Sequence, residues 1–418
     1  MRLFDLRREE TADAVRVAAT IAWEDSDRRP RKIWAEVAPA LGPALTEELD
    51  GFAVAAAVVA QHHGERRLIV EGTLCPRLAE GLAAAARLLA RWFSAALPAP
   101  VIESSRGTAP RFPPPVPRAG VFLSGGLDSL FAVAHNRDRY PREHPASLRD
   151  AVVLEGYIFE PTDDSPRARD YWRRTQKATT AFAAAADLHP IFVRTNLRVL
   201  EDDIGFFCAK YHAAMLSSVA HLLSRRISSA TIAAGLDAAI LRAWGSHPVL
   251  DPLYSGSALA VFHEGIETPR IGKAGRIAAW PEALASLMVC TRGPLGSGSL
   301  NCGRCEKCVR TLAALGPTAA RAASFDETDL TPALLRKLST GLHPWAVADF
   351  WSEIVESFRA RGQSELASAA EELVSRAHVA DAWRFHRGWK GMLRRLDRRF
   401  LGSALLQSSR RLRSRRSA

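Results

Sequence analysis

Short apolar runs alternate with longer helix-like segments between residues 119 and 235. The predicted strands span 120–123, 151–159, 190–194 and 229–234, and the predicted helices span 129–136, 171–186 and 206–224. Strands that alternate with helices pair in parallel through right-handed crossovers. The pattern therefore predicts an α/β fold with a doubly wound parallel sheet.

The segments on either side of this region have a different pattern. Predicted strands at 14–23, 32–37 and 67–70 and a predicted helix at 78–92 indicate a small α+β domain over residues 1–97. Seven of the 24 prolines lie in residues 98–118, which predicts an extended linker. We expect the main domain to cover 119–316 and a helical region to cover 317–383, since no strand pattern follows residue 317.

The net charge of +11 comes from the C-terminal end of the 418-residue chain. Residues 384–418 contain twelve Lys and Arg and one acid, while the other 383 residues contain 44 bases and 44 acids. Apolar residues recur every three or four positions from Phe385 to Phe400, the pattern of an amphipathic helix. Three interpretations stay open for this tail: a helix on the protein's own core, contact with an anionic membrane, and contact with RNA.

The rest of the composition is that of an ordinary globular protein. No apolar run reaches the 18 or so residues that a membrane span needs, and residues 1–10 are too charged for a secretory signal. We therefore expect a cytoplasmic protein, with a peripheral membrane location as the alternative that the tail allows. A homodimer is a further expectation for its assembly.

A serine- and glycine-rich hexapeptide lies between the first strand and the first helix of the α/β region. Its residues are Ser124, Gly125, Gly126, Leu127, Asp128 and Ser129. Such a turn offers free backbone N–H groups and hydroxyls to a phosphate at the carboxyl end of a strand, and Asp128 can hold Mg²⁺. The alternative is a tight, solvent-facing turn. A Walker A motif is excluded, because Gly272-Lys273-Ala274 lacks the required hydroxyl.

The hexapeptide resembles the Ser-Gly-Gly-x-Asp-Ser loop of the PP-loop ATP pyrophosphatases, a superfamily related to the adenine nucleotide alpha hydrolases and of HUP-like fold. The resemblance implies that the loop binds the pyrophosphate of ATP. It further implies that the α-phosphate is transferred, as AMP, to a carbonyl or carboxylate oxygen of a substrate.

Four of the six cysteines lie within 19 positions and form a C-x11-C-x2-C-x2-C motif: Cys290, Cys302, Cys305 and Cys308. Four thiolates at this spacing suit a closed tetrahedral Zn²⁺ site of structural role. An iron–sulfur cluster and a redox Cys-x-x-Cys pair are the alternatives. Basic residues near the motif, among them Arg304 and Arg310, are expected to offset the negative charge of the thiolates.

The loop and the cysteine knuckle together resemble the 7-cyano-7-deazaguanine synthase family of queuosine biosynthesis. That family has a C-x8-C-x2-C-x2-C zinc site followed by an arginine, and Arg310 follows the last cysteine here. The resemblance covers residues 119–315. The sequence departs from the family in its longer first cysteine gap, in the segments before Pro98 and after Gly316, and in its substrate-recognition middle.

Other residues are candidates for the site on weaker grounds. Asp237 follows the last predicted strand and contacts substrate or caps a helix. His247 is a general base or stabilises a turn, and Lys273 stabilises developing charge or lies at the surface. Thr195 ends a predicted strand and is a candidate contact for adenosine. The adjacent His62 and His63 are interpreted as solvated loop residues.

The sequence thus predicts an ATP-dependent ligase or amidotransferase-like enzyme that uses ATP, Mg²⁺ and Zn²⁺. Its substrate would be a small acid, of the 7-carboxy-7-deazaguanine type or another, and it would add a nitrogen nucleophile and release AMP and pyrophosphate. Sulfur transfer to a tRNA base is the second possibility. The third is a non-catalytic nucleotide-binding scaffold that docks through the basic tail.

Overall fold

The computed structural model describes residues 1–93, 98–292, 298–341 and 343–382. They form two compact units. The first comprises Met1–Cys302 and Arg321–Asp326, and the second comprises Gly303–Ala320 and the chain from Glu327 onward. The basic tail lies outside the described residues. In the described part of the chain, no helix has the length and apolar character needed to cross a bilayer.

The first unit is built on one ten-stranded sheet with the order β10-β9-β6-β7-β8-β3-β2-β1-β4-β5. The five strands from β10 to β8 are parallel, and β8 continues into β3 by antiparallel pairing. These five are β6 (Ala119–Phe122), β7 (Leu148–Glu155), β8 (His189–Thr195), β9 (Ser229–Ala233) and β10 (Ala260–Glu264). In chain order, the parallel half reads 3-2-1-4-5, the arrangement of a doubly wound fold.

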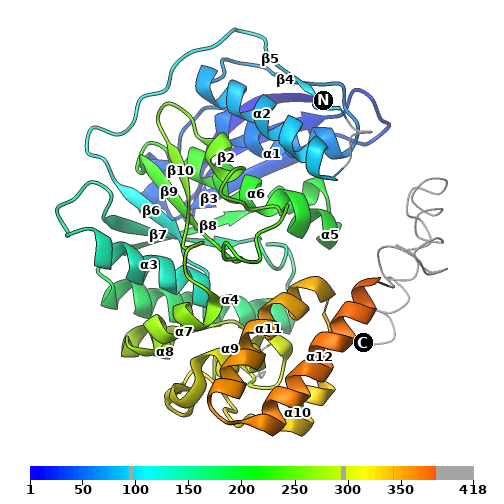
Figure 1. Cartoon of the computed structure of the whole chain (residues 1–418). Coiled ribbons are helices and arrows are strands. Elements are labelled where there is room, and N and C mark those ends of the chain that lie inside the picture. Colours follow the sequence, from blue (N-terminus) through cyan, green and yellow to red (C-terminus); the bar gives the residue numbers. More distant parts are fainter. Residues whose placement is uncertain (94–97, 293–297, 342, 383–418) are drawn as a thin grey trace. The chain divides into compact units, whose positions relative to one another are not determined.

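Helices cover both faces of this sheet (Figure 1). One face carries α3 (Leu127–Arg139), α4 (Pro166–Ala185), α7 (Arg270–Ala278) and α8 (Pro281–Ser286). The other carries α1 (Asp50–His62), α2 (Pro76–Phe93), the short α5 (Ile204–Phe206) and α6 (His212–Leu222). Twelve of the 13 residues of α1 are buried, because it is apolar on every side and packs against α6. The predicted α/β class is confirmed.

The N-terminal strands extend the same sheet. They are β1 (Arg2–Glu10), β2 (Val15–Ala22), β3 (Arg31–Val37), β4 (Arg67–Val70) and β5 (Val101–Ser104). Only two residue pairs join β3 to β8, Ala35 with Thr195 and Glu36 with Arg194. This architecture differs from the prediction of a separate domain over residues 1–97.

The proline-rich segment is not a free linker between domains. It contains the edge strand β5, the position in a sheet that tolerates neighbouring prolines. Further along, Arg111 donates from Nε to Asp50 Oδ2 at 2.7 Å and from Nη2 to the carbonyl of Thr73 at 3.0 Å. These contacts hold the segment against the surface that α1 and the loop after β4 form.

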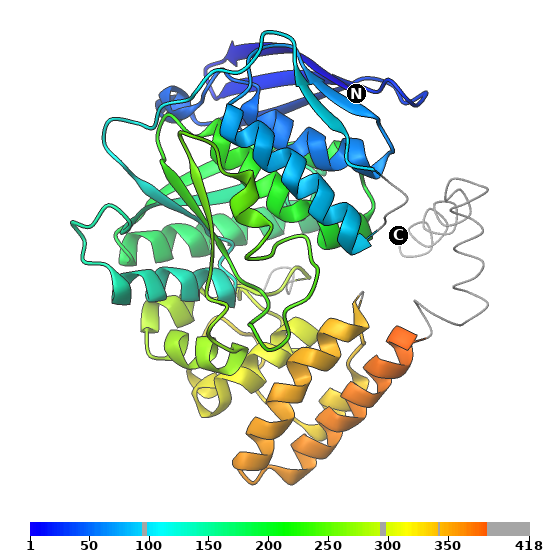
Figure 2. The same cartoon turned by 45° about the horizontal axis from the view of Figure 1, so that its top comes forward.

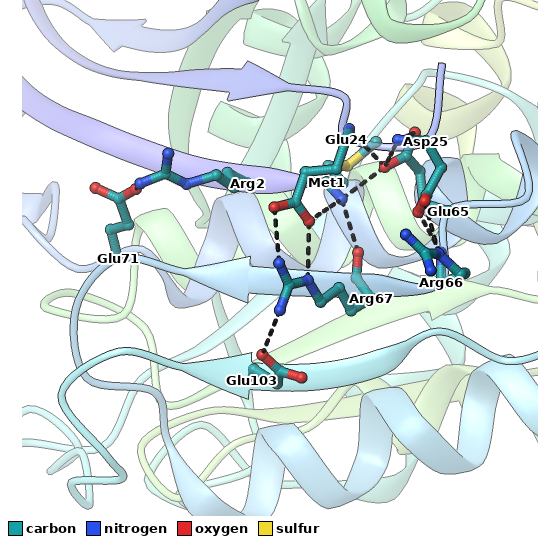
Figure 3. A network of polar contacts seen from close by, with 9 residues as sticks. All are labelled: Met1, Arg2, Glu24, Asp25, Glu65, Arg66, Arg67, Glu71 and Glu103. Atoms are coloured by element: carbon teal, nitrogen blue, oxygen red, sulfur yellow. Dashed lines mark hydrogen bonds and ion pairs between the residues drawn. The ribbon is translucent and has the colours of Figure 1, made fainter.

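The start of the chain is fixed by buried polar contacts (Figure 3). The Met1 amine and the Glu65 side chain are both fully buried, and the Met1 nitrogen lies 2.6 Å from Glu65 Oε2. The amine also donates to the carbonyl of Arg67 at 2.8 Å and to Glu24 Oε2 at 3.1 Å. The beginning of β1 is thereby tied to β4.

The second unit is helical and includes α9 (Glu306–Leu315), α10 (Pro332–Lys337), α11 (Pro344–Ala360) and α12 (Ser364–Ala382). Its core contains Trp351 and Phe358 of α11 and Leu373 of α12. The Trp351 indole is fully buried and donates to Glu306 Oε1 at 3.0 Å. The helical unit therefore begins at Gly303, earlier than the predicted residue 317. Figure 2 shows these helices in a second view.

Candidate functional site

The hexapeptide forms the turn after β6 and continues into the first turn of α3, which begins at Leu127. Gly125 has a φ of +74°, a conformation that glycine adopts without strain, and its carbonyl accepts from the N–H of Met288 at 2.8 Å. The Ser124 and Ser129 hydroxyls lie 3.2 Å apart, and Ser129 donates to the carbonyl of Gly126 at 2.9 Å. The first N–H groups of α3, beginning at Leu127, have no acceptor within the helix and are available to an anion.

The loop lies where the strand order of the sheet reverses. β6 pairs with β7 on one side and with β9 on the other, and the loop follows the carboxyl end of β6. In open α/β sheets this reversal leaves a crevice that receives ligands.

Two buried cations from α7 approach the loop. The Lys273 side chain is 2% exposed, and its Nζ lies 3.5 Å from Asp128 Oδ1 and 2.6 Å from the carbonyl of Ala234 at the end of β9. The Arg270 side chain is 8% exposed, and its Nη1 lies 3.7 Å from Asp128 Oδ2. These three side chains carry a net charge of +1, so the end of the loop favours an anion.

A cavity of about 250 Å³ opens beside the loop. Ser124, Asp128 and Ser129 line it on the loop side. Its walls are mostly apolar and come from β7, α4, α6 and the segment after β9, with residues such as Val152, Leu154, Tyr157, Ile232, Leu241 and Trp244. A largely apolar cavity with a few polar groups at one end is the usual form of a small-molecule site.

A buried polar cluster forms another part of the cavity wall. Asp251, fully buried, accepts from the Ser246 hydroxyl at 2.6 Å and lies 2.8 Å from His263 Nδ1 on β10. Ser246 and His263 both line the cavity. Because Asp251 binds Nδ1, His263 keeps its Nε2 lone pair, and no described residue hydrogen-bonds this buried nitrogen. The cluster can therefore accept a proton.

His247, the predicted base, lies outside the cavity lining. Its ring packs on Trp92 of α2 with centroids 4.8 Å apart, and its Nδ1 accepts from the N–H of Val249 at 3.1 Å. Burial lowers the pKa of His247. His263, which follows it on β10, lines the cavity instead. No local pattern marks His263 as a site residue, because β10 is a five-residue strand after a long loop.

Two other predicted residues have structural partners instead. The Thr195 hydroxyl is buried and donates to the carbonyl of Trp34 at 2.6 Å, so it joins β8 to β3 and does not line the cavity. Asp237 accepts from the N–H of Ala239 at 2.9 Å in a turn, while its neighbours Gly235 and Leu236 line the cavity. Thr195 therefore lies outside the cavity lining, whereas Asp237 lies next to two residues that line it.

A π-helical turn shapes the α6 side of the cavity. Phe207–Tyr211 forms this turn directly before α6, and His212 at the start of α6 lines the cavity. Burial lowers the pKa of His212. A Cβ on Gly245 would lie 2.7 Å from His212 Nδ1 and 2.8 Å from the carbonyl oxygen of Cys208, so only glycine allows this approach. Such π turns often occur at functional sites.

The four predicted metal ligands come together. The Sγ atoms of Cys290, Cys302, Cys305 and Cys308 lie within 4.8 Å of one another, a group that could bind a metal such as zinc. Cys290 Sγ lies 3.6 Å from Cys302 Sγ, and Cys305 Sγ lies 3.4 Å from Cys308 Sγ. Tetrahedral zinc with Zn–S bonds of about 2.3 Å separates its sulfurs by about 3.8 Å, so the thiols fit the ion.

Local contacts position the cysteines. The Asn301 side chain is fully buried and accepts from the N–H groups of Val289 and Cys290 at 2.7 and 3.1 Å. Cys305 precedes the first turn of α9 and Cys308 lies within that turn, where the helix N-terminus favours a thiolate. Two of the predicted counter-charges pair with acids, Arg304 with Glu327 and Arg310 with Glu306.

A comparison of the chain with protein families, curated proteins and solved structures finds no match.

Proposed function

We propose that the chain binds ATP at the Ser124–Ser129 loop and transfers AMP to the carboxylate of a small acid, releasing pyrophosphate. A nitrogen nucleophile then replaces the AMP. The observation that carries this proposal is the convergence of Lys273 and Arg270 on the loop at the reversal of strand order. The resemblance of the hexapeptide to the PP-loop supports the same assignment.

Different residues of the site would bind the phosphates, hold Mg²⁺ and accept the proton. The N–H groups at the start of α3 and the Ser124 and Ser129 hydroxyls would hold phosphate oxygens, with Lys273 and Arg270 balancing their charge. Asp128, a carboxylate with a 28% exposed side chain, would hold Mg²⁺, which would draw charge from the phosphates. We assign to His263 the proton that the nitrogen nucleophile loses.

The position of the cysteines favours nitrogen over sulfur as the transferred atom. Sulfur transfer needs a reactive thiol at the reaction centre. In the described part of the chain, no cysteine lines the cavity beside the loop. Four of the six cysteines form the candidate metal group, and the buried Cys75 accepts from the N–H of Ser257 at 3.3 Å.

Pyrophosphate release tests the proposed reaction. The purified chain with Mg²⁺-ATP and a panel of small acids is expected to release pyrophosphate with at least one of them. Asp128→Asn should lower the rate by about 10²-fold or more, because it removes the charge that would hold Mg²⁺. Asp138→Asn is the matched control, since Asp138 lies on the same helix and pairs with Arg276 at the surface.

Three results would contradict the proposal in different ways. Nucleotide binding without pyrophosphate release from any acid would support the scaffold alternative. Equal rates in the wild type and in Asp128→Asn would remove the loop from the reaction. Modification of a cysteine by iodoacetamide in the metal-loaded protein, with loss of activity, would favour sulfur transfer.

A further inference from the structure

A second cluster of metal-binding side chains lies at the C-terminal end of α1. His62 is the last residue of α1, His63 follows it, and Glu201 approaches them from the segment after β8. One ligand atom from each of these residues lies within 4.8 Å of the others. The side chains are 29%, 8% and 12% exposed, so the histidines are partly buried rather than solvated as the sequence suggested.

The distances between these side chains indicate a shared ligand. His63 Nε2 is buried and lies 3.2 Å from Glu201 Oε2. His62 Nε2 lies 3.8 Å from the same oxygen. Nitrogen and oxygen ligands about 2.0–2.2 Å from a tetrahedral Zn²⁺ are separated by roughly 3.3–3.6 Å. The three ligand atoms are therefore close enough to share one ion.

The surroundings hold the ligands in place and favour a cation. Glu201 Oε1 accepts from the N–H of Asp203 at 3.0 Å, which leaves Oε2 toward the histidines. The His62 ring stacks on Phe206 with centroids 4.1 Å apart. The C-terminal end of α1 carries the negative end of the helix dipole. The positive charge of Lys210 and the negative charge of Asp203 have opposite effects at His62.

We propose that His62, His63 and Glu201 bind a divalent transition-metal ion of the Zn²⁺ type. Two imidazoles and one carboxylate suit this class of ion and leave coordination positions for water or a ligand. This site is distinct from the four-cysteine group and does not depend on the proposed nucleotide chemistry.

Zinc stoichiometry tests this proposal. The full-length chain is dialysed against Zn²⁺, desalted and analysed for bound zinc. Glu201→Gln and His63→Ala are each expected to hold one zinc equivalent fewer than the wild type. Glu201→Gln keeps the side-chain volume and an acceptor for the N–H of Asp203, so the fold is expected to persist, as circular dichroism would show. His378→Ala, on the exposed face of α12, should hold as much zinc as the wild type.

Titration with Co²⁺ separates this site from the cysteines. Wild type should bind one more Co²⁺ ion than Glu201→Gln. That additional ion should contribute no thiolate-to-cobalt charge-transfer band to the wild-type spectrum. Equal zinc content in the wild type and both variants would overturn the proposal. The same conclusion would follow if the lost equivalent carried the thiolate band.

Discussion

Lys273 places a buried positive charge beside the Ser124–Ser129 loop. Its ammonium is almost fully buried, donates to the carbonyl of Ala234 at 2.6 Å and lies 3.5 Å from the carboxylate of Asp128. Taking an ammonium out of water costs several kcal/mol unless partners offset the loss. Arg270, one turn earlier on α7, adds a second buried cation beside the same carboxylate. A phosphate at the loop would complete this set of charges.

The histidines give a residue-level prediction for the reaction. His263→Asn should lower the rate of product formation by about 10²- to 10⁴-fold, because it removes the proposed proton acceptor. Nucleotide affinity should stay unchanged, since β9 lies between β10, which carries His263, and β6, which precedes the phosphate loop. Turnover and equilibrium binding, measured on the same preparations, check both expectations.

His247→Asn is the matched control, because His247 packs on Trp92 and does not line the cavity. It should leave turnover within about threefold of the wild type. A larger effect of His247→Asn than of His263→Asn would contradict the assignment of the base.

The residues of the site were predictable to different degrees. The loop and the four cysteines are contiguous or closely spaced, so a local motif is enough to make them candidates. Lys273 was a candidate because lysine is rare here, with seven in the chain. Thr195 was assigned to adenosine because it ends a strand. The Thr195 hydroxyl instead bonds to Trp34 where β8 pairs with β3. These two residues are 161 positions apart, so no local sequence pattern reveals the contact.

At the scale of elements, helix and strand periodicity predicted most of the α/β half. The strands β6, β8 and β9 and the helices α2, α3 and α4 are confirmed within a few residues. The buried helix α1 escaped prediction because an all-apolar helix has no polar face to reveal its period. Strand β1 is also missing from the prediction, because it is rich in charged residues, with Arg and Glu on its exposed face.

The segment between β9 and β10 depends on one glycine. Gly245→Ala would place a Cβ 2.7–2.8 Å from His212 and from the backbone of Cys208 and Lys210. We expect this substitution to lower the free energy of unfolding by about 1–3 kcal/mol and to weaken nucleotide binding, because the cavity wall must shift. Chemical denaturation and binding titration measure the two effects.

Gly275→Ala is the control for this substitution. Gly275 lies inside α7, and an added Cβ there would meet nothing within 4 Å. It should raise the free energy of unfolding by about 0.5–1 kcal/mol, because alanine favours a helix over glycine. A Gly245→Ala protein as stable as the wild type would show that the close approach at the π turn is not needed.

At the scale of the whole molecule, charge and chemistry lie in different parts of the chain. The 383 residues before the tail are neutral overall, while residues 384–418 carry +11. The proposed site would attract phosphate through a few buried groups rather than through net charge. A partner that the tail binds would respond to salt, because contacts between exposed charges are screened.

Deletion of residues 384–418 tests this separation. The truncated chain should bind nucleotide and release pyrophosphate within about twofold of the full chain. Any association with RNA or with anionic vesicles that falls as salt rises should be lost. If the folded, truncated protein loses turnover of a small substrate, the tail takes part in catalysis and the separation is wrong.

The proposed function requires that the Ser124–Ser129 loop and Lys273 bind the phosphates of ATP. Calorimetric titration with an ATP analogue that carries a methylene bridge between its α- and β-phosphates tests it directly, since this analogue is not cleaved there. Wild type and Lys177→Met, whose lysine is exposed on α4, should bind equally. Lys273→Met should bind about 10- to 100-fold more weakly, as expected for one lost charge-assisted contact, and circular dichroism checks that it stays folded. Equal binding by Lys273→Met, or no binding by the wild type, would contradict the account.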